Sequence, residues 1–155
     1  MLNVAEIVKD AEEKKKIART ILEALPEWFE VESSREQYIA EAPERIMVAT
    51  RDGEEPTGFL CLKETGDATV EIAVMGVRKE YHRHGLGRIL FAKAKEIAKE
   101  KGYAFIQVKT VKMGMYEDYD RTNRFYQSLG FREFEVFPEL WDEANPCQIY
   151  VMTTD

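Results

Sequence analysis

Gly85 and Gly87 stand two residues apart, where a β-rich run gives way to a stretch with apolar residues at helical spacing. Glycine lets a backbone approach an anion closely, and the first turn of a helix offers unpaired N–H groups with a partial positive charge behind them. Arg83, His84 and Arg88 add cationic or donor side chains. The segment is therefore a candidate phosphate-binding turn, although a tight strand-to-helix turn with solvated basic side chains would show the same spacing.

Other phosphate and metal motifs fit this segment poorly. In the dinucleotide-binding pattern GxGxxG the third glycine would fall on Leu90, and the P-loop pattern GxxxxGK(S/T) is absent. His82 and His84 lack a third metal ligand nearby and have cationic neighbours. The sequence thus disfavours a nicotinamide or flavin site, and no metal is expected.

Glu71 is a candidate general base. It lies in the run Thr69–Val77, whose alternation places it on the same face as Ala73, Met75 and Val77. Apolar neighbours would make a carboxylate a stronger proton acceptor through desolvation. An edge glutamate that faces water is the alternative interpretation.

Tyr126 is a candidate proton donor, since a phenol can give a proton to a departing thiolate of similar basicity. It also belongs to an apolar helical stripe with Phe125 and Leu129, so a simple core position is the alternative. The acidic residues just before this stripe are expected in a loop, where they either line an acceptor pocket or are merely solvated. These residues are Glu117, Asp118 and Asp120.

The periodicity of apolar residues predicts the element order βααβββαβαββ. The expected strands are 2–8, 46–50, 57–63, 69–77, 104–110, 131–137 and 148–153. The expected helices are 12–25, one that begins at Ser33 or Ser34 and ends near Pro43, 85–101, and 121–129. The strand–helix–strand unit over 69–110 predicts one parallel pair in an otherwise antiparallel sheet.

Composition narrows the class of protein further. With 155 residues, 45% of them hydrophobic, the chain is expected to form a single domain over 1–155. The net charge of -7 disfavours nucleic acid and suits a cationic amine. No signal peptide or membrane span is recognised, so a cytoplasmic protein without a membrane partner is expected. Cys61 and Cys147 lie in apolar runs and are expected to be buried thiols.

Two segments resemble motifs of the GNAT superfamily of N-acetyltransferases. The segment Val77–Arg88 resembles motif A, Q/R-x-x-G-x-G/A, with Gly85 and Gly87 at the glycine positions and His82 in place of Gln or Arg. The segment Asn123–Phe131 resembles the element N-x-x-(F/Y)-Y-x-x-x-G-F. The element order is also similar to that of the family, so the resemblance covers nearly the whole chain and is weakest before residue 46.

The resemblance implies an α/β fold in which a mixed, mostly antiparallel sheet has one parallel pair splayed around a CoA site, with helices on both faces. It implies transfer of an acetyl group from acetyl-CoA to a primary amine, by direct attack of the amine on the thioester. Backbone groups of Met75 and Val77 would bind the pantetheine arm, and Asn123 would bind the pantetheine or adenine end. The residues of the turn would bind the pyrophosphate: Arg83, His84, Gly85, Leu86, Gly87 and Arg88.

The resemblance also places Tyr126 beside the thioester sulfur. Glu71, fourteen residues before Gly85, matches the Glu that serves as base in the protein-lysine-acetylating branch, whereas other members use other groups or water. The acceptor is left open between a small-molecule amine and a protein or peptide amine, and so is a homodimer. A non-catalytic acyl-CoA sensor and a transferase of a longer acyl group are the alternative functions.

Overall fold

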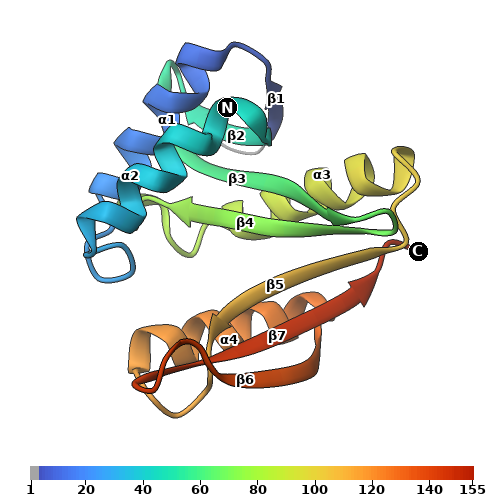
Figure 1. Ribbon diagram of the computed structural model, residues 1–155. Coiled ribbons are helices and arrows are strands. Elements are labelled where there is room, and N and C mark those ends of the chain that lie inside the picture. The colour runs from blue at the N-terminus through green and yellow to red at the C-terminus, as the bar shows by residue number, and fades with distance from the viewer. Residues whose placement is uncertain (1–3) are drawn as a thin grey trace. The chain divides into compact units, whose positions relative to one another are not determined.

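The computed structural model describes residues 4–155 (Figure 1). Along the chain it contains β1 (Glu6–Val8), α1 (Ala11–Glu23), α2 (Glu32–Glu41), η1 (Ala42–Glu44), β2 (Ile46–Asp52), β3 (Glu55–Gly66), β4 (Thr69–Val77), η2 (Lys79–Tyr81), α3 (Leu86–Glu100), β5 (Phe105–Val111), α4 (Glu117–Leu129), β6 (Arg132–Asp142) and β7 (Asn145–Thr153). Apart from the short 3-10 helices η1 and η2, this is the predicted order. The first part of the strand predicted at 2–8 lies outside the described residues.

Over residues 4–155 the strands form a seven-stranded sheet in the order β1-β2-β3-β4-β5-β7-β6. β1 pairs with β2, β2 with β3, and β7 with both β5 and β6, all in antiparallel fashion. β4 and β5 are parallel, from Thr69 opposite Phe105 to Ile72 opposite Val108. The mixed sheet with a parallel pair is therefore confirmed, while the splay of that pair around a ligand stays a prediction.

The described part of the chain divides into two compact units. Unit 1 comprises the residues up to Lys63 together with Ala73–Ile97, and unit 2 comprises Glu64–Ile72 and Ala98–Asp155. The boundaries fall inside β3, β4 and α3, so these three elements contribute to both units. The single domain expected from length stays a prediction.

Unit 1 has helices on both faces of its strands (Figure 1). Asp10 caps α1 by accepting a hydrogen bond from the Glu13 amide at 2.9 Å. The buried residues of α1 recur at helical spacing and so form one side of the helix. That side packs against one face of the strands, in a core that includes Ile17, Ile21, Leu22, Met47, Ala49, Phe59, Cys61 and Val74. α3 covers the opposite face, where Leu90 Cδ1 lies 3.1 Å from the Cβ position of Gly58.

Unit 2 has a helix on one face of β5 and β7. Tyr126 of α4 contacts Tyr150 of β7, with 6.3 Å between the ring centroids. Gly130 ends α4 in the left-handed conformation, with φ of 105°, and its amide bonds back to the last turn. Alternate residues of β5, which include Gln107 and Lys109, point to the other face.

Several element boundaries differ from the prediction, and three of these differences concern how a helix starts or how two strands are connected. α4 begins at Glu117 rather than at residue 121, because three acidic side chains fall in its first turn, where the helix dipole favours them. Ser33 and Ser34 lie inside α2, whose N-cap is Val31 and has no side-chain capping bond. β6 continues to Asp142, where it pairs with Asn145 of β7, so the connection is a tight hairpin rather than a long loop.

Residues 4–155 contain no helix long and apolar enough to span a membrane.

Gly76 of β4 leads to a testable expectation about the core of unit 1. A Cβ at this position would lie 2.9 Å from Leu25 Cδ1 and 3.0 Å from Ile21 Cγ2, both in buried side chains. We expect Gly76→Ala to lower the free energy of unfolding by about 1–3 kcal/mol through overpacking. Gly66→Ala is the matched control, because its Cβ would meet no atom within 4 Å, and it should change stability by less than about 0.5 kcal/mol. Urea denaturation measures both, and equal stabilities would contradict the packing at Gly76.

Candidate functional site

The turn between β4 and α3 has an unusual backbone. Arg83 and Gly85 both lie in the left-handed region, with φ of 69° and 76°. The Ile89 amide bonds to the Gly85 carbonyl at 3.1 Å, which starts the helical ladder of α3. The amides that precede Ile89 in the first turn therefore have no acceptor within the helix. Such a turn points successive N–H groups at a common region, which is an arrangement that binds anions.

The side chains around this turn leave that region open. A Cβ at Gly85 would meet no atom within 4 Å, and Arg83, His84 and Arg88 are exposed. Leu86 is only 1% exposed, so its side chain belongs to the core and only its backbone can contact a ligand. Open space, helix amides and cationic side chains together fit a phosphate group.

His82 holds the turn to the end of β4. Its Nε2 donates a hydrogen bond to the Val77 carbonyl at 2.6 Å, and its ring meets Trp28 edge-on with 6.2 Å between centroids. His82 is the position at which the sequence departs from motif A. Here its ring bridges the strand end and the turn, while Met75 and Val77 are half-buried on β4.

Tyr126 combines a core ring with a hydroxyl that has no protein partner. The residue is 7% exposed, and its ring packs against Phe125 and Phe131 with centroid separations of 5.6 and 5.7 Å. Within residues 4–155 the hydroxyl makes no hydrogen bond, and burial raises the pKa of Tyr126 above its usual range. The two sequence interpretations are therefore compatible, since the ring serves the core and the protonated hydroxyl is left for a ligand.

Asn123 has a structural role in this arrangement. It is fully buried, and its Nδ2 donates to the carbonyls of Val111 at 2.8 Å and Tyr119 at 2.7 Å. Its Oδ1 accepts a bond from the Tyr150 hydroxyl at 2.6 Å. Both Nδ2 hydrogens are used and the side chain is buried, so Asn123 is better placed to fasten α4 to β5 and β7 than to contact CoA directly.

Glu71 has a charged neighbour that the sequence analysis did not identify. Lys109 Nζ lies 2.7 Å from Glu71 Oε1, and the two side chains are 29% and 13% exposed. The purely apolar surroundings expected for Glu71 are therefore wrong. The alternation of β5 could have placed Lys109 on the right face, but only the register of β4 against β5 brings it to Glu71.

Glu71 and Tyr126 lie on opposite faces of the sheet of unit 2. Glu71 bonds to Lys109, which stands opposite Ile149 on β7. Tyr126 packs on the next residue of that strand, Tyr150, whose side chain points the other way. The two groups therefore cannot exchange a proton directly and would have to act on different atoms of a substrate.

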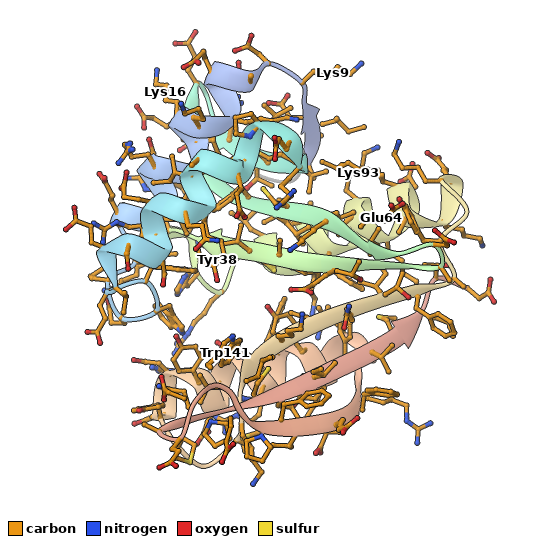
Figure 2. The ribbon with its side chains drawn as sticks, viewed as in Figure 1. Lys9, Lys16, Tyr38, Glu64, Lys93 and Trp141 are labelled. Carbon is orange, nitrogen blue, oxygen red and sulfur yellow. The ribbon has the colours of Figure 1, made fainter. Side chains whose placement is uncertain are left out.

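The acidic candidates have partners within the protein. Asp118 forms an ion pair with Arg121, and Asp120 Oδ1 accepts a bond from the Gly114 amide at 2.7 Å, so both belong to α4 and its approach rather than to a loop. Trp28 and Phe29 pack against the core of unit 1. Trp141 is 47% exposed on β6 (Figure 2).

Thiols and metal ligands add no further site. Cys61 and Cys147 are buried free thiols, as predicted, and burial raises their pKa values to about 12 and about 11. In the part of the chain that the structure describes, no three His, Cys, Asp or Glu side chains are grouped so as to hold a metal ion.

Comparison with known proteins gives a family match. The sequence model of the acetyltransferase (GNAT) family matches residues 14–131. No curated protein sequence matches the chain.

Several solved structures share the fold. A protein from Desulfovibrio desulfuricans that is assigned to the GNAT acetyltransferases has a TM-score of 0.83 and 17% identity, covering 98% of this chain and 99% of that one. An aminoglycoside 6′-N-acetyltransferase complexed with coenzyme A has a TM-score of 0.74 and 21% identity, covering 97% of each chain. An N-acetyltransferase of Escherichia coli named for an alanine of a ribosomal protein has a TM-score of 0.77 and 15% identity, covering 98% and 95%. At these identities the similarity concerns the fold.

The hydroxyl groups of Tyr126 and Tyr150 should differ in their effect on stability. The Tyr150 hydroxyl donates to Asn123 and accepts a bond from Gln127 Nε2 at 3.2 Å, whereas the Tyr126 hydroxyl has no partner in residues 4–155. We expect Tyr150→Phe to lower the free energy of unfolding by about 1–2 kcal/mol. Tyr126→Phe should change it by less than about 0.5 kcal/mol. Chemical denaturation decides the matter, and a large loss for Tyr126→Phe would show that its hydroxyl has a structural partner.

Proposed function

Because the chain belongs to the acetyltransferase (GNAT) family, we propose that it transfers an acetyl group from acetyl-CoA to the nitrogen of a primary amine. The observation that carries the proposal is the left-handed turn at Arg83 and Gly85, which leads into the N-terminal turn of α3. A diphosphate ester such as CoA is the kind of ligand that such a turn accepts. The solved aminoglycoside acetyltransferase with bound coenzyme A supports the choice of donor.

The proposed roles in binding follow from exposure. Amides of Gly85, Leu86 and Gly87 would bind the pyrophosphate, and the exposed side chains of Arg83, His84 and Arg88 would add charge. Backbone groups of Met75 and Val77 would bind the pantetheine arm, although the Val77 carbonyl already accepts a bond from His82. Asn123 would act indirectly, by fixing the helix that carries Tyr126.

The proposed chemistry uses two proton-handling residues at different atoms. An alkyl ammonium cannot attack a carbonyl, so Glu71 would take a proton from the acceptor, directly or through one water. The free amine would then form a C–N bond with the acetyl carbon as the C–S bond breaks. Tyr126 would donate its hydroxyl proton to the departing thiolate, and the second proton that the nitrogen releases, passed on through water, would restore the phenol.

The proposed acceptor is a cationic amine in the cytoplasm. Fold neighbours are named for acceptors as different as an aminoglycoside and an alanine of a ribosomal protein. The net charge of -7 favours a positively charged acceptor of either kind. A panel that contains an aminoglycoside, a linear diamine and a peptide with an N-terminal alanine, with release of CoA thiol as the signal, would test the proposed reaction.

Acetyl-CoA should bind with micromolar affinity, and Gly87→Asp should abolish this binding. A carboxylate in the first turn of α3 would occupy the space of the pyrophosphate and repel its charge. Isothermal titration calorimetry measures both proteins, with NAD and ATP as ligands that should bind far more weakly. Gly66→Asp is the control, because Gly66 is exposed and lies outside the turn. Absence of heat with the folded wild type would refute the proposed function, and full affinity of Gly87→Asp would refute the role of the turn.

Tyr126→Phe should keep acetyl-CoA binding and lower kcat by roughly 10²-fold, which is the lower end of the effect of losing a general acid. Steady-state kinetics with the best acceptor of the panel measures the change. Tyr116→Phe serves as the control, since Tyr116 is 45% exposed just before α4. An unchanged kcat would leave Tyr126 as a core residue only.

A further inference from the structure

The ion pair between Lys109 and Glu71 connects neighbouring parallel strands. The residue that stands opposite Glu71 in the register is Gln107, yet Gln107 turns its Nε2 away to donate to Thr65 Oγ1 at 2.8 Å. Lys109, two residues further along β5 and on the same face as Gln107, supplies the hydrogen bond to Glu71 instead. The ion pair is therefore a diagonal contact between the two strands, set by their register, and does not join directly opposite residues.

Lys109 contacts one oxygen of the carboxylate and leaves the other free. The 2.7 Å bond is to Oε1, and within residues 4–155 Oε2 accepts no hydrogen bond. The Glu71 side chain is only 13% exposed, so its surroundings restrict the orientation of the carboxylate. An ammonium bound at Oε1 fixes the carboxylate plane and presents Oε2 as the free acceptor.

The other titratable groups near this pair do not replace Lys109. Cys147 of β7 interacts electrostatically with both Glu71 and Lys109, but burial raises the pKa of its thiol to about 11 and keeps it neutral. Glu64, next to Thr65 on β3, accepts a bond from the Tyr103 hydroxyl at 2.5 Å. Glu135 of β6 lies in the same row as Lys109, with Ile149 between them. Lys109 is thus the cation that contacts Glu71 in unit 2.

We propose that Lys109 is a positioning residue for the base, which binds Oε1 of Glu71 and aims the free oxygen, Oε2, at the acceptor amine. This inference rests on the proposed function, since it concerns the same reaction. Glu71 takes the acceptor's proton and becomes a carboxylic acid, while Lys109 keeps its own protons. Loss of Lys109 would remove the bond that fixes the carboxylate plane, so Oε2 should accept the proton less efficiently.

The first test follows the carboxylate itself and needs no acceptor. Carbon-13 NMR of glutamate-labelled protein at neutral pH observes the Glu71 carboxyl, with Glu71→Gln to identify the signal. Lys109→Met keeps most of the side chain but removes the ammonium that binds Oε1, so the Glu71 signal should move toward that of the exposed glutamates in the same sample. Lys109→Arg can still donate to Oε1 and should give a signal close to that of the wild type. An unchanged Glu71 signal in folded Lys109→Met would overturn the proposal.

The second test asks whether this contact to Glu71 matters for the reaction. With the best acceptor of the panel, Lys109→Met should lower kcat about 10-fold while acetyl-CoA affinity stays unchanged, because losing the whole of a general base costs at least about 10²-fold. Lys109→Arg should recover most of the loss. Glu71→Gln should lose activity at neutral pH and recover part of it at high pH, where free amine is abundant. If the NMR signal moves but kcat does not change, Lys109 does not position a base. If the wild type binds no acetyl-CoA, the proposed function fails while the NMR result on the ion pair still stands.

Discussion

The candidate site depends on the alternation of side chains between the two faces of β4, which repeats every two residues. Its buried positions, Val70, Ile72, Val74 and Gly76, are committed to packing, and Gly76 has no side chain because Leu25 and Ile21 occupy that space. The alternate positions, which include Glu71, Met75 and Val77, are thereby freed for polar contacts. A slip of one residue would exchange the two sets and bury the carboxylate.

Packing and chemistry share the same residues on α4. The aromatic ring of Tyr126 fills the core of unit 2, and the buried amide of Asn123 bonds to β5, to its own helix and to Tyr150. A buried polar network of this kind holds one arrangement, because each broken bond would leave an unpaired group. The fixed helix can then present one unpartnered hydroxyl at a defined place.

Different electrostatic effects act on Tyr126 and Glu71, the two residues that would transfer protons in the proposed reaction. Burial raises the pKa of the Tyr126 phenol and keeps it protonated, as a donor must be, while the ammonium of Lys109 binds one oxygen of the Glu71 carboxylate and leaves the other free for a proton. The two influences have different origins, one in desolvation and the other in a charge. The proposed proton donor, Tyr126, and the proposed proton acceptor, Glu71, thus lie on opposite faces of the sheet of unit 2 and in different surroundings.

The order of elements, the parallel pair, the buried cysteines and the family were predictable from sequence, because each depends on local periodicity or on short motifs such as Gly85-Leu86-Gly87 and Asn123–Phe131. The first turn of α4, from Glu117, and the extension of β6 and β7 into a tight hairpin were missed, since acidic residues and exposed aromatics give no clear periodic signal. Only the tertiary structure showed that Asn123 is fully bonded within the protein, that His82 holds the Val77 carbonyl and that Lys109 meets Glu71. Sequence spacing determines which face a side chain takes, whereas the register between strands distant in sequence decides which charge stands beside it.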